Sequence, residues 1–116
     1  MPYKITITEV AESQLEALSV REQRILQSAI LTRLIDAPTT ATRAIKVLRP
    51  NPFAQFELRV RDLRVLYNVE EAASQVVLLI VGRKDGNKLI VEGEDFHGHQ
   101  SDSPQPPGSG PAGNPE

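Results

Sequence analysis

The chain has 116 residues, no cysteine and a single methionine, at position 1. This length fits one domain, and the lack of cysteine excludes disulfides, thiolate metal sites and cysteine nucleophiles. No apolar run approaches the ~20 residues that span a bilayer, and no apolar signal segment precedes the patterned sequence. We therefore expect a soluble, cytoplasmic protein that does not enter a membrane.

Charge is unevenly distributed along the chain. Residues 1–91 carry 13 Lys and Arg against ten Asp and Glu, whereas residues 92–116 carry five acidic residues and no basic one. The stretch 43–64 is the most basic, with six Lys and Arg against only Glu57 and Asp62. A basic stretch of this kind is either ordinary solvated surface or a phosphate-binding surface.

The composition predicts a folded domain over residues 1–95 and a disordered acidic tail over residues 96–116. From Ser101 onward the tail holds five Pro and three Gly in 16 residues, and such a segment cannot bury enough apolar surface to offset its ordering entropy. His97 and His99 lie at the edge of this tail. Two histidines without an obvious third ligand are a weak metal motif, so we interpret them as part of an exposed linker.

The first third of the chain predicts a strand followed by a helix hairpin. Residues 3–7 alternate apolar and polar side chains, as a half-buried strand does. Thr8 is a suitable N-cap for a helix, and Ser19 with Glu22 forms a capping box for a second one. We expect this second helix to run to about Asp36, with Pro38 ending it.

The remainder of the chain is predicted to be mostly strand. Alternation predicts strands over 55–61 and 63–69 that are joined by a tight turn at Arg61–Asp62, and we interpret Tyr67, in phase with this pattern, as a core residue. A turn over 70–74, a buried strand over 76–81, a loop over 82–87 and a short strand over 88–91 follow. The order strand–helix–helix–three or four strands predicts an α+β fold, a mainly antiparallel sheet with the helix hairpin on one face.

Taken in order, these segments resemble the RelE/ParE superfamily of toxins from bacterial type II toxin–antitoxin systems. The resemblance covers about residues 3–91 and is carried by Tyr3-Lys4-Ile5, the helix hairpin, and the segments at 44–50 (AIKVLRP), 56–67 (FELRVRDLRVLY) and 81–84 (VGRK). It implies that a cognate antitoxin binds the chain. It also implies one of two activities: RelE-like toxins cleave messenger RNA on the ribosome without a metal, and ParE-like toxins inhibit DNA gyrase. The shared fold cannot decide between them.

The resemblance also implies a phosphate site without a metal or cofactor. Arg64 matches the arginine that follows the hairpin turn, and Arg83 and Lys84 match a basic pair after valine–glycine. Arginines suit such a site because they stay charged and grip phosphate with two hydrogen bonds. The candidate catalytic residues are Arg64, Arg83, Lys84, Arg59 and Glu57. The candidate nucleic-acid-binding residues are Lys46, Arg49 and Arg61.

The acid–base half of this site departs from the family's pattern. Gln55 and Glu57 stand where RelE-like nucleases carry alternating lysines, and Ile90 stands where active members often place a tyrosine. Glu57 could act as a base, but we favour an ordinary cross-strand ion pair of small value. Three hypotheses stay open: a RelE-like endoribonuclease acting on ribosome-bound messenger RNA, a ParE-like gyrase inhibitor that is not a nuclease, and a decayed toxin that only binds its antitoxin. The oligomeric state is not indicated.

Overall fold

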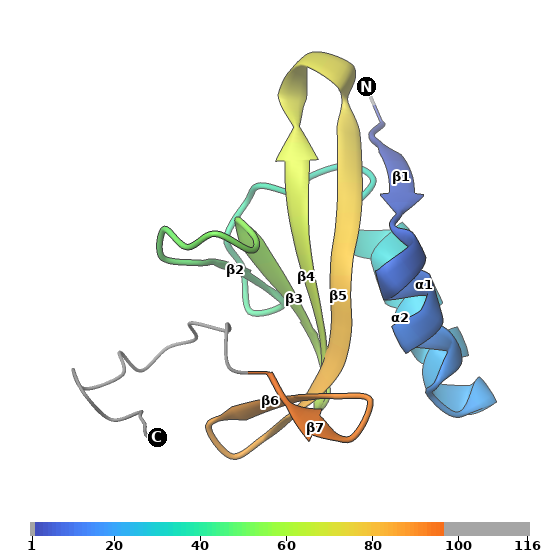
Figure 1. Cartoon of the computed structure of the whole chain (residues 1–116). Coiled ribbons are helices and arrows are strands. Elements are labelled where there is room, and N and C mark those ends of the chain that lie inside the picture. Colours follow the sequence, from blue (N-terminus) through green and yellow to red (C-terminus); the bar gives the residue numbers. More distant parts are fainter. Residues whose placement is uncertain (1, 97–116) are drawn as a thin grey trace.

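The computed structural model describes residues 2–96 and has the predicted α+β architecture, with two helices on one face of a mainly antiparallel sheet (Figure 1). The helices are α1 (Glu9–Glu16) and α2 (Val20–Arg33). The strands are β1 (Lys4–Ile7), β2 (Ile45–Val47), β3 (Phe56–Val60), β4 (Leu63–Glu70), β5 (Gln75–Asp85), β6 (Lys88–Val91) and β7 (Glu94–Asp95), with a 3₁₀ turn at Glu71–Ala73.

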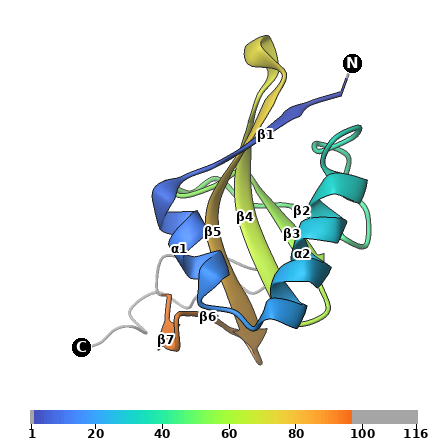
Figure 2. The same cartoon turned by 90° about the vertical axis from the view of Figure 1, so that its right-hand side faces the viewer.

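Strand β5 is the centre of the sheet. The strand order is β2-β3-β4-β5-β6-β7, with antiparallel neighbours throughout, and β1 lies parallel to the first half of β5. The two ends of β5 therefore have different neighbours on the edge away from β4: β1 at the start and β6 at the finish. The helix pair covers one side of this sheet in the view of Figure 2.

The helix starts follow the predicted capping residues. Thr8 Oγ1 accepts a hydrogen bond of 3.1 Å from the Ala11 N–H. The capping box at α2 is complete, because Ser19 Oγ accepts from the Glu22 N–H and Glu22 Oε1 accepts from the Ser19 N–H. Helix α2 ends at Arg33, earlier than the predicted Asp36, since Leu34 leaves the helix with its side chain fully buried.

The main core lies between the helices and the sheet. It combines helix residues such as Leu26 and Ile30 with inward-facing strand residues such as Leu58, Val65 and Val76, all nearly inaccessible to solvent. Tyr67 belongs to this core, as predicted: its ring stacks on Phe56 at 5.4 Å, and its hydroxyl donates to the Pro38 carbonyl oxygen at 2.6 Å. We call this side of the sheet the helix face.

A second, smaller apolar cluster lies on the opposite side of the sheet, which we call the open face. Its buried members are Leu48, Ala54, Leu66, Leu89 and Val91. Strand β6 approaches β5 closely beside it, because a Cβ atom on Gly82 would lie 2.5 Å from the Ile90 carbonyl oxygen. Only glycine permits that approach, so Gly82 fixes where the β6–β7 end of the sheet can pack.

Three sequence predictions about the strands were wrong. The predicted loop over 82–87 is largely strand, since β5 continues to Asp85 and pairs with β6. Strands β2 and β7 were not predicted, because three and two residues are too short to display an alternation. The described residues therefore hold more strands after the helices than the expected three or four. Phe96, the first residue of the predicted tail, is described, and its N–H donates to the Leu89 carbonyl oxygen at 2.7 Å. The rest of the predicted tail, residues 97–116 with His97 and His99, lies outside the described residues. No helix in the part of the chain that the structure describes is long and apolar enough to cross a membrane.

Candidate nucleic-acid interface

Alternation along the β3–β4 hairpin sorts its side chains between the two faces of the sheet. Leu58 and Val65 face each other in the β3–β4 register and point into the main core. Their neighbours Glu57, Arg59 and Arg64 must therefore lie on the open face. With Lys46, Arg49 and Lys84 these residues form what we call the cationic cluster.

Glu57 is the buried centre of the cationic cluster. Its side chain has no exposed surface, and its Oε1 accepts a hydrogen bond of 3.2 Å from Arg59 Nε. Lys46 lies directly opposite Glu57 in the β2–β3 register. We expected a cross-strand ion pair of small value at Glu57. The pair with Arg59 lies within one strand, and it is not a small surface effect, because a fully buried carboxylate is costly unless cations surround it.

Arg64 is held in a fixed position beside Arg59. Its Nη1 donates to the carbonyl oxygens of Arg61 at 2.7 Å and Leu63 at 2.8 Å. Among the described residues its buried Nε has no hydrogen-bond partner. Burial lowers the pKa of Arg64, as does the charge of Arg59, whereas the negative charge of Glu57 raises it.

Arg59 and Arg64 directly oppose each other across β3 and β4. The Arg59 N–H donates to the Ala44 carbonyl oxygen, away from β4, so this is a non-hydrogen-bonded pair, in which side chains come closest. Like charges directly opposite one another destabilise a sheet. An anion bound between them would remove that repulsion.

Lys46 lies close to most of the charged groups of the cationic cluster. Burial lowers the pKa of Lys46, and the charges of Arg59, Lys84 and Arg49 lower it further, while Glu57 raises it. Residues from β3, from β5 and from the segment after β2 thus act on one ammonium group. The cluster holds five cations against one carboxylate, so its excess positive charge suits a polyanion such as a nucleic-acid backbone.

Arg83 is not part of the cationic cluster. It faces Leu63 in the β4–β5 register and so lies on the helix face. There Nη1 donates to Glu22 Oε2 at 2.9 Å and Asp62 Oδ2 at 3.2 Å, and Nη2 donates to Glu22 Oε1 at 3.2 Å. The hydrogen bond from Arg83, with those from Ser19, lowers the pKa of Glu22 to about 2. Adjacent Lys84 has the opposite parity and lies on the open face, so the structure separates the basic pair that the sequence suggested as one unit.

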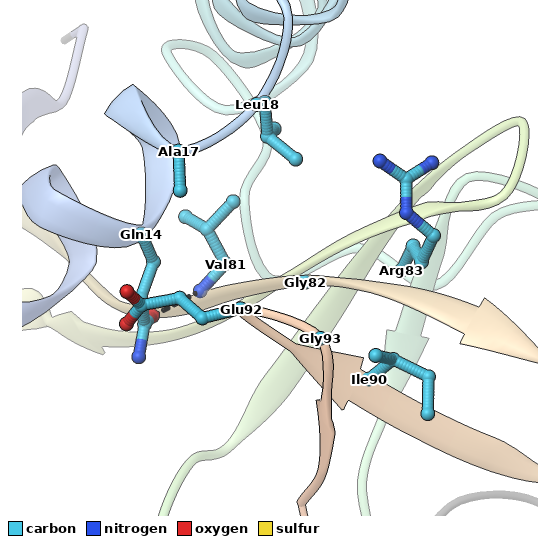
Figure 3. Close-up of a pocket in the computed structure, with 9 residues that line it drawn as sticks. All are labelled: Gln14, Ala17, Leu18, Val81, Gly82, Arg83, Ile90, Glu92 and Gly93. Carbon is cyan, nitrogen blue, oxygen red and sulfur yellow. Dashed lines mark hydrogen bonds between the residues drawn. The ribbon is translucent and has the colours of Figure 1, made fainter.

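Ile90 lies with Arg83 on the helix face, in a pocket of about 350 Å³ between the end of α1 and the β6–β7 turn (Figure 3). Gln14 anchors the pocket, since its Oε1 accepts from the Val81 N–H at 2.8 Å. The predicted nucleic-acid-binding residue Arg61 is exposed at the hairpin turn, with a φ of 58°. Neither residue belongs to the interior of the cationic cluster.

The acid–base groups that are common in nucleases are scarce here. Residues 2–96 contain no histidine, and their two tyrosines are engaged away from the cluster. Tyr3 donates its hydroxyl to Glu71 Oε1 at 2.7 Å, and burial raises the pKa of the core phenol of Tyr67. No group of three or more His, Cys, Asp or Glu within the described residues could hold a metal ion.

Two features of the site escaped the sequence reasoning. Lys46 was predicted to bind nucleic acid, but its position beside the central carboxylate was not foreseen. Glu57 was expected to form an ion pair of small value but is fully buried. No local pattern indicated this position of Lys46, because β2 is too short to display an alternation. No local signal reveals the burial of Glu57, because its cover comes from other strands.

No protein-family model and no curated protein matches the chain. Solved structures do. A chain of the toxin–antitoxin complex RelBE2 from Mycobacterium tuberculosis is 26% identical, with a TM-score of 0.63 over 72% of this chain and 100% of that one. A chain of the archaeal RelE–RelB complex from Pyrococcus horikoshii is 17% identical, with a TM-score of 0.59 over 75% of this chain and 99% of that one. The isolated RelE toxin of E. coli is 16% identical, with a TM-score of 0.51 over 72% of this chain and 85% of that one. The chain has the fold of the RelE superfamily of toxins.

Proposed function

We propose that the chain is the toxin of a type II toxin–antitoxin pair, held by a cognate antitoxin, and that it is an endoribonuclease that cleaves ribosome-bound messenger RNA. The likeness to chains of RelBE2 and of the RelE–RelB complex supports the toxin role and the antitoxin partner. The cationic cluster carries the nuclease part of the proposal. It is a preformed surface with excess positive charge on the sheet face that the helices leave uncovered.

Metal-independent RNA cleavage makes three demands on a protein. The 2′-hydroxyl must lose its proton, the negative charge on the five-coordinate phosphorus must be stabilised, and the leaving 5′-oxygen must gain a proton. Arg59 and Arg64 meet the second demand, because their guanidinium groups stay charged and are fixed by contacts to Glu57 and to the hairpin turn. Fixed donors stabilise a developing charge without reorganising at the moment of reaction.

Glu57 is the buried counter-charge of this cationic surface. A carboxylate with no exposed surface does not touch a substrate in this conformation, so its contacts fit a positioning role and not that of a base. It offsets part of the repulsion among Lys46, Arg59 and Arg64 while it leaves an excess of positive charge for the phosphate.

The test is a cleavage assay with purified protein and ribosomes carrying a defined message. We expect wild-type protein to cut the message at the ribosomal A site and the Arg59→Gln, Arg64→Gln double variant to lose at least ~10²-fold in rate. Arg24→Gln, an exposed arginine on α2, is the matched control and retains activity. An uncut message with folded wild-type protein contradicts the nuclease proposal.

The second candidate, a ParE-like inhibitor of DNA gyrase, is favoured by one observation. Neither tyrosine of the described residues is in the cationic cluster, and no histidine is among these residues, so the acid–base part of a nuclease site is reduced. A gyrase supercoiling assay run beside the ribosome assay separates the two activities. Inhibition of supercoiling without message cleavage supports the gyrase function.

A further inference from the structure

We infer that Lys46 is the proton donor of this site and protonates the 5′-oxygen that leaves when RNA is cut. This inference rests on the proposed endoribonuclease function. It assigns a catalytic role to a residue of the edge strand β2, outside the β3–β4 hairpin that supplies both arginines.

Lys46 lies on the same face of the sheet as the two arginines. It faces Glu57 across β2 and β3, on the same side of the sheet as Arg59 and Arg64. Its side chain is only partly buried, whereas the neighbouring carboxylate of Glu57 is closed to solvent. A phosphate held by the two arginines would thus have Lys46 at its edge.

Few side chains near the two arginines can donate a proton. Arginine side chains do not give up a proton near neutral pH. The hydroxyls of Tyr3 and Tyr67 donate to Glu71 and to the Pro38 carbonyl oxygen, away from the open face. Of the described residues on the cluster, only Lys46 and Lys84 can both reach solvent and transfer a proton.

The surroundings favour Lys46 over Lys84. The groups that face the Lys46 ammonium are Glu57 and Arg59 from β3, Lys84 from β5 and Arg49 from the segment after β2, and three of the four are cations. Burial and these cations lower the pKa of Lys46, which makes its ammonium a stronger acid. A donor whose pKa lies closer to the working pH transfers its proton more effectively.

The cleavage is a transesterification within the RNA strand. The 2′-hydroxyl loses its proton to water, and the 2′-oxygen attacks phosphorus. The bond between phosphorus and the 5′-oxygen breaks, and a proton from Lys46 Nζ passes to that oxygen. The products are a 2′,3′-cyclic phosphate and a free 5′-hydroxyl, and neutral Lys46 regains its proton from water.

The decisive experiment compares two leaving groups in single-turnover cleavage on programmed ribosomes. One message carries a normal phosphodiester at the cut site, and the other carries a 5′-bridging sulfur there, which leaves as a thiolate and needs no proton. We expect Lys46→Arg to slow cleavage of the normal message by ~10²–10³-fold and to cut the sulfur-bridged message about as fast as wild type. Lys4→Arg, at an exposed lysine of β1 outside the cationic cluster, is the matched control and should cut both messages like wild type.

The pH profile gives a second readout. Wild-type activity should fall at alkaline pH as Lys46 loses its proton, and this fall should be missing in Lys46→Arg, because the arginine stays charged. Thermal melting verifies that the variant is folded, and Lys46→Gln repeats the sulfur test if Lys46→Arg is not. Equal slowing on both messages, or wild-type rates on the normal message, overturns the role of Lys46 alone. A wild-type protein that cuts neither message overturns the nuclease function itself, so the two failures are distinguishable.

Discussion

Arg64 and Arg83 come from adjacent strands near the same end of the sheet, yet they meet opposite surroundings. On the helix face, Arg83 binds two carboxylates, those of Glu22 and Asp62. On the open face, Arg64 stands directly across from Arg59. A charge whose partners belong to the same chain holds the fold together. Opposed like charges cost stability, and the single carboxylate of Glu57 offsets that repulsion only in part.

A shift of one position along a strand changes the role of a basic side chain. Arg83 and Lys84 are neighbours in the sequence, but a strand sends successive side chains to opposite faces. The first therefore braces α2 against the end of the hairpin, and the second joins the cationic cluster. The sequence suggested that Arg83 and Lys84 act together, but in the structure they lie on opposite faces and have different roles.

The largest expected effect is on the rate of message cleavage, and it should differ between Arg64 and Arg83. Arg64→Gln should lower the rate of message cleavage by ~10²–10³-fold, because it removes a fixed charge from the phosphate site. Arg83→Gln should leave the rate of the folded protein within about threefold of wild type. The measurement is single-turnover cleavage on programmed ribosomes. An equal loss of cleavage rate in both variants would contradict the different roles of the two faces.

The next largest effect is on the free energy of unfolding and concerns Glu57, the buried carboxylate of the cationic cluster. Glu57→Gln should destabilise the protein by about 3 kcal/mol, because it leaves the surrounding cations without their buried counter-charge. Glu70→Gln, at an exposed position, is the control and should change stability by less than about 0.5 kcal/mol. Urea unfolding measures both. A change as small as that of the control would mean that Glu57 is an ordinary surface charge after all.

A smaller effect tests the helix face through pH. The pKa of Glu22 is lowered to about 2 in the folded state, from an ordinary value of 4.5. A lowered pKa means that the pairing with Arg83 contributes fully above pH 4.5 and is lost as pH falls toward 2. Because both side chains are partly exposed, we expect the contribution to be about 1 kcal/mol. Urea unfolding between pH 6 and pH 2.5 should show a weaker pH dependence in Glu22→Gln than in wild type.

The smallest expected effect concerns the tail. Deleting residues 101–116 should shift the melting temperature by no more than about two degrees, because a segment this rich in Pro and Gly has too little apolar surface to add to a core. Calorimetry of the full and the shortened chain measures this. A large loss of stability would show that the predicted boundary of the folded domain is wrong.

Much of the fold was determined by local sequence. The caps at Thr8 and Ser19 act within one helical turn, and the alternation of residues 63–69 places Tyr67 in the core, so these features were predictable from neighbours in the chain. The longer strands were predicted for the same reason. Strand β2 and the continuation of β5 through Gly82 were missed, because their pairing partners are distant in sequence.

The candidate site divides in the same way. The sequence by itself determined which arginines the hairpin carries and that Arg59 and Arg64 share a face with Glu57, since period-two alternation is a local property. Only the tertiary structure decided that Glu57 is fully buried, that Lys46 lies opposite it, and that Glu22 of α2 binds Arg83. Burial and ion pairing depend on which segments fold over a residue, and that is settled by the packing of the whole chain and not by its neighbours in sequence.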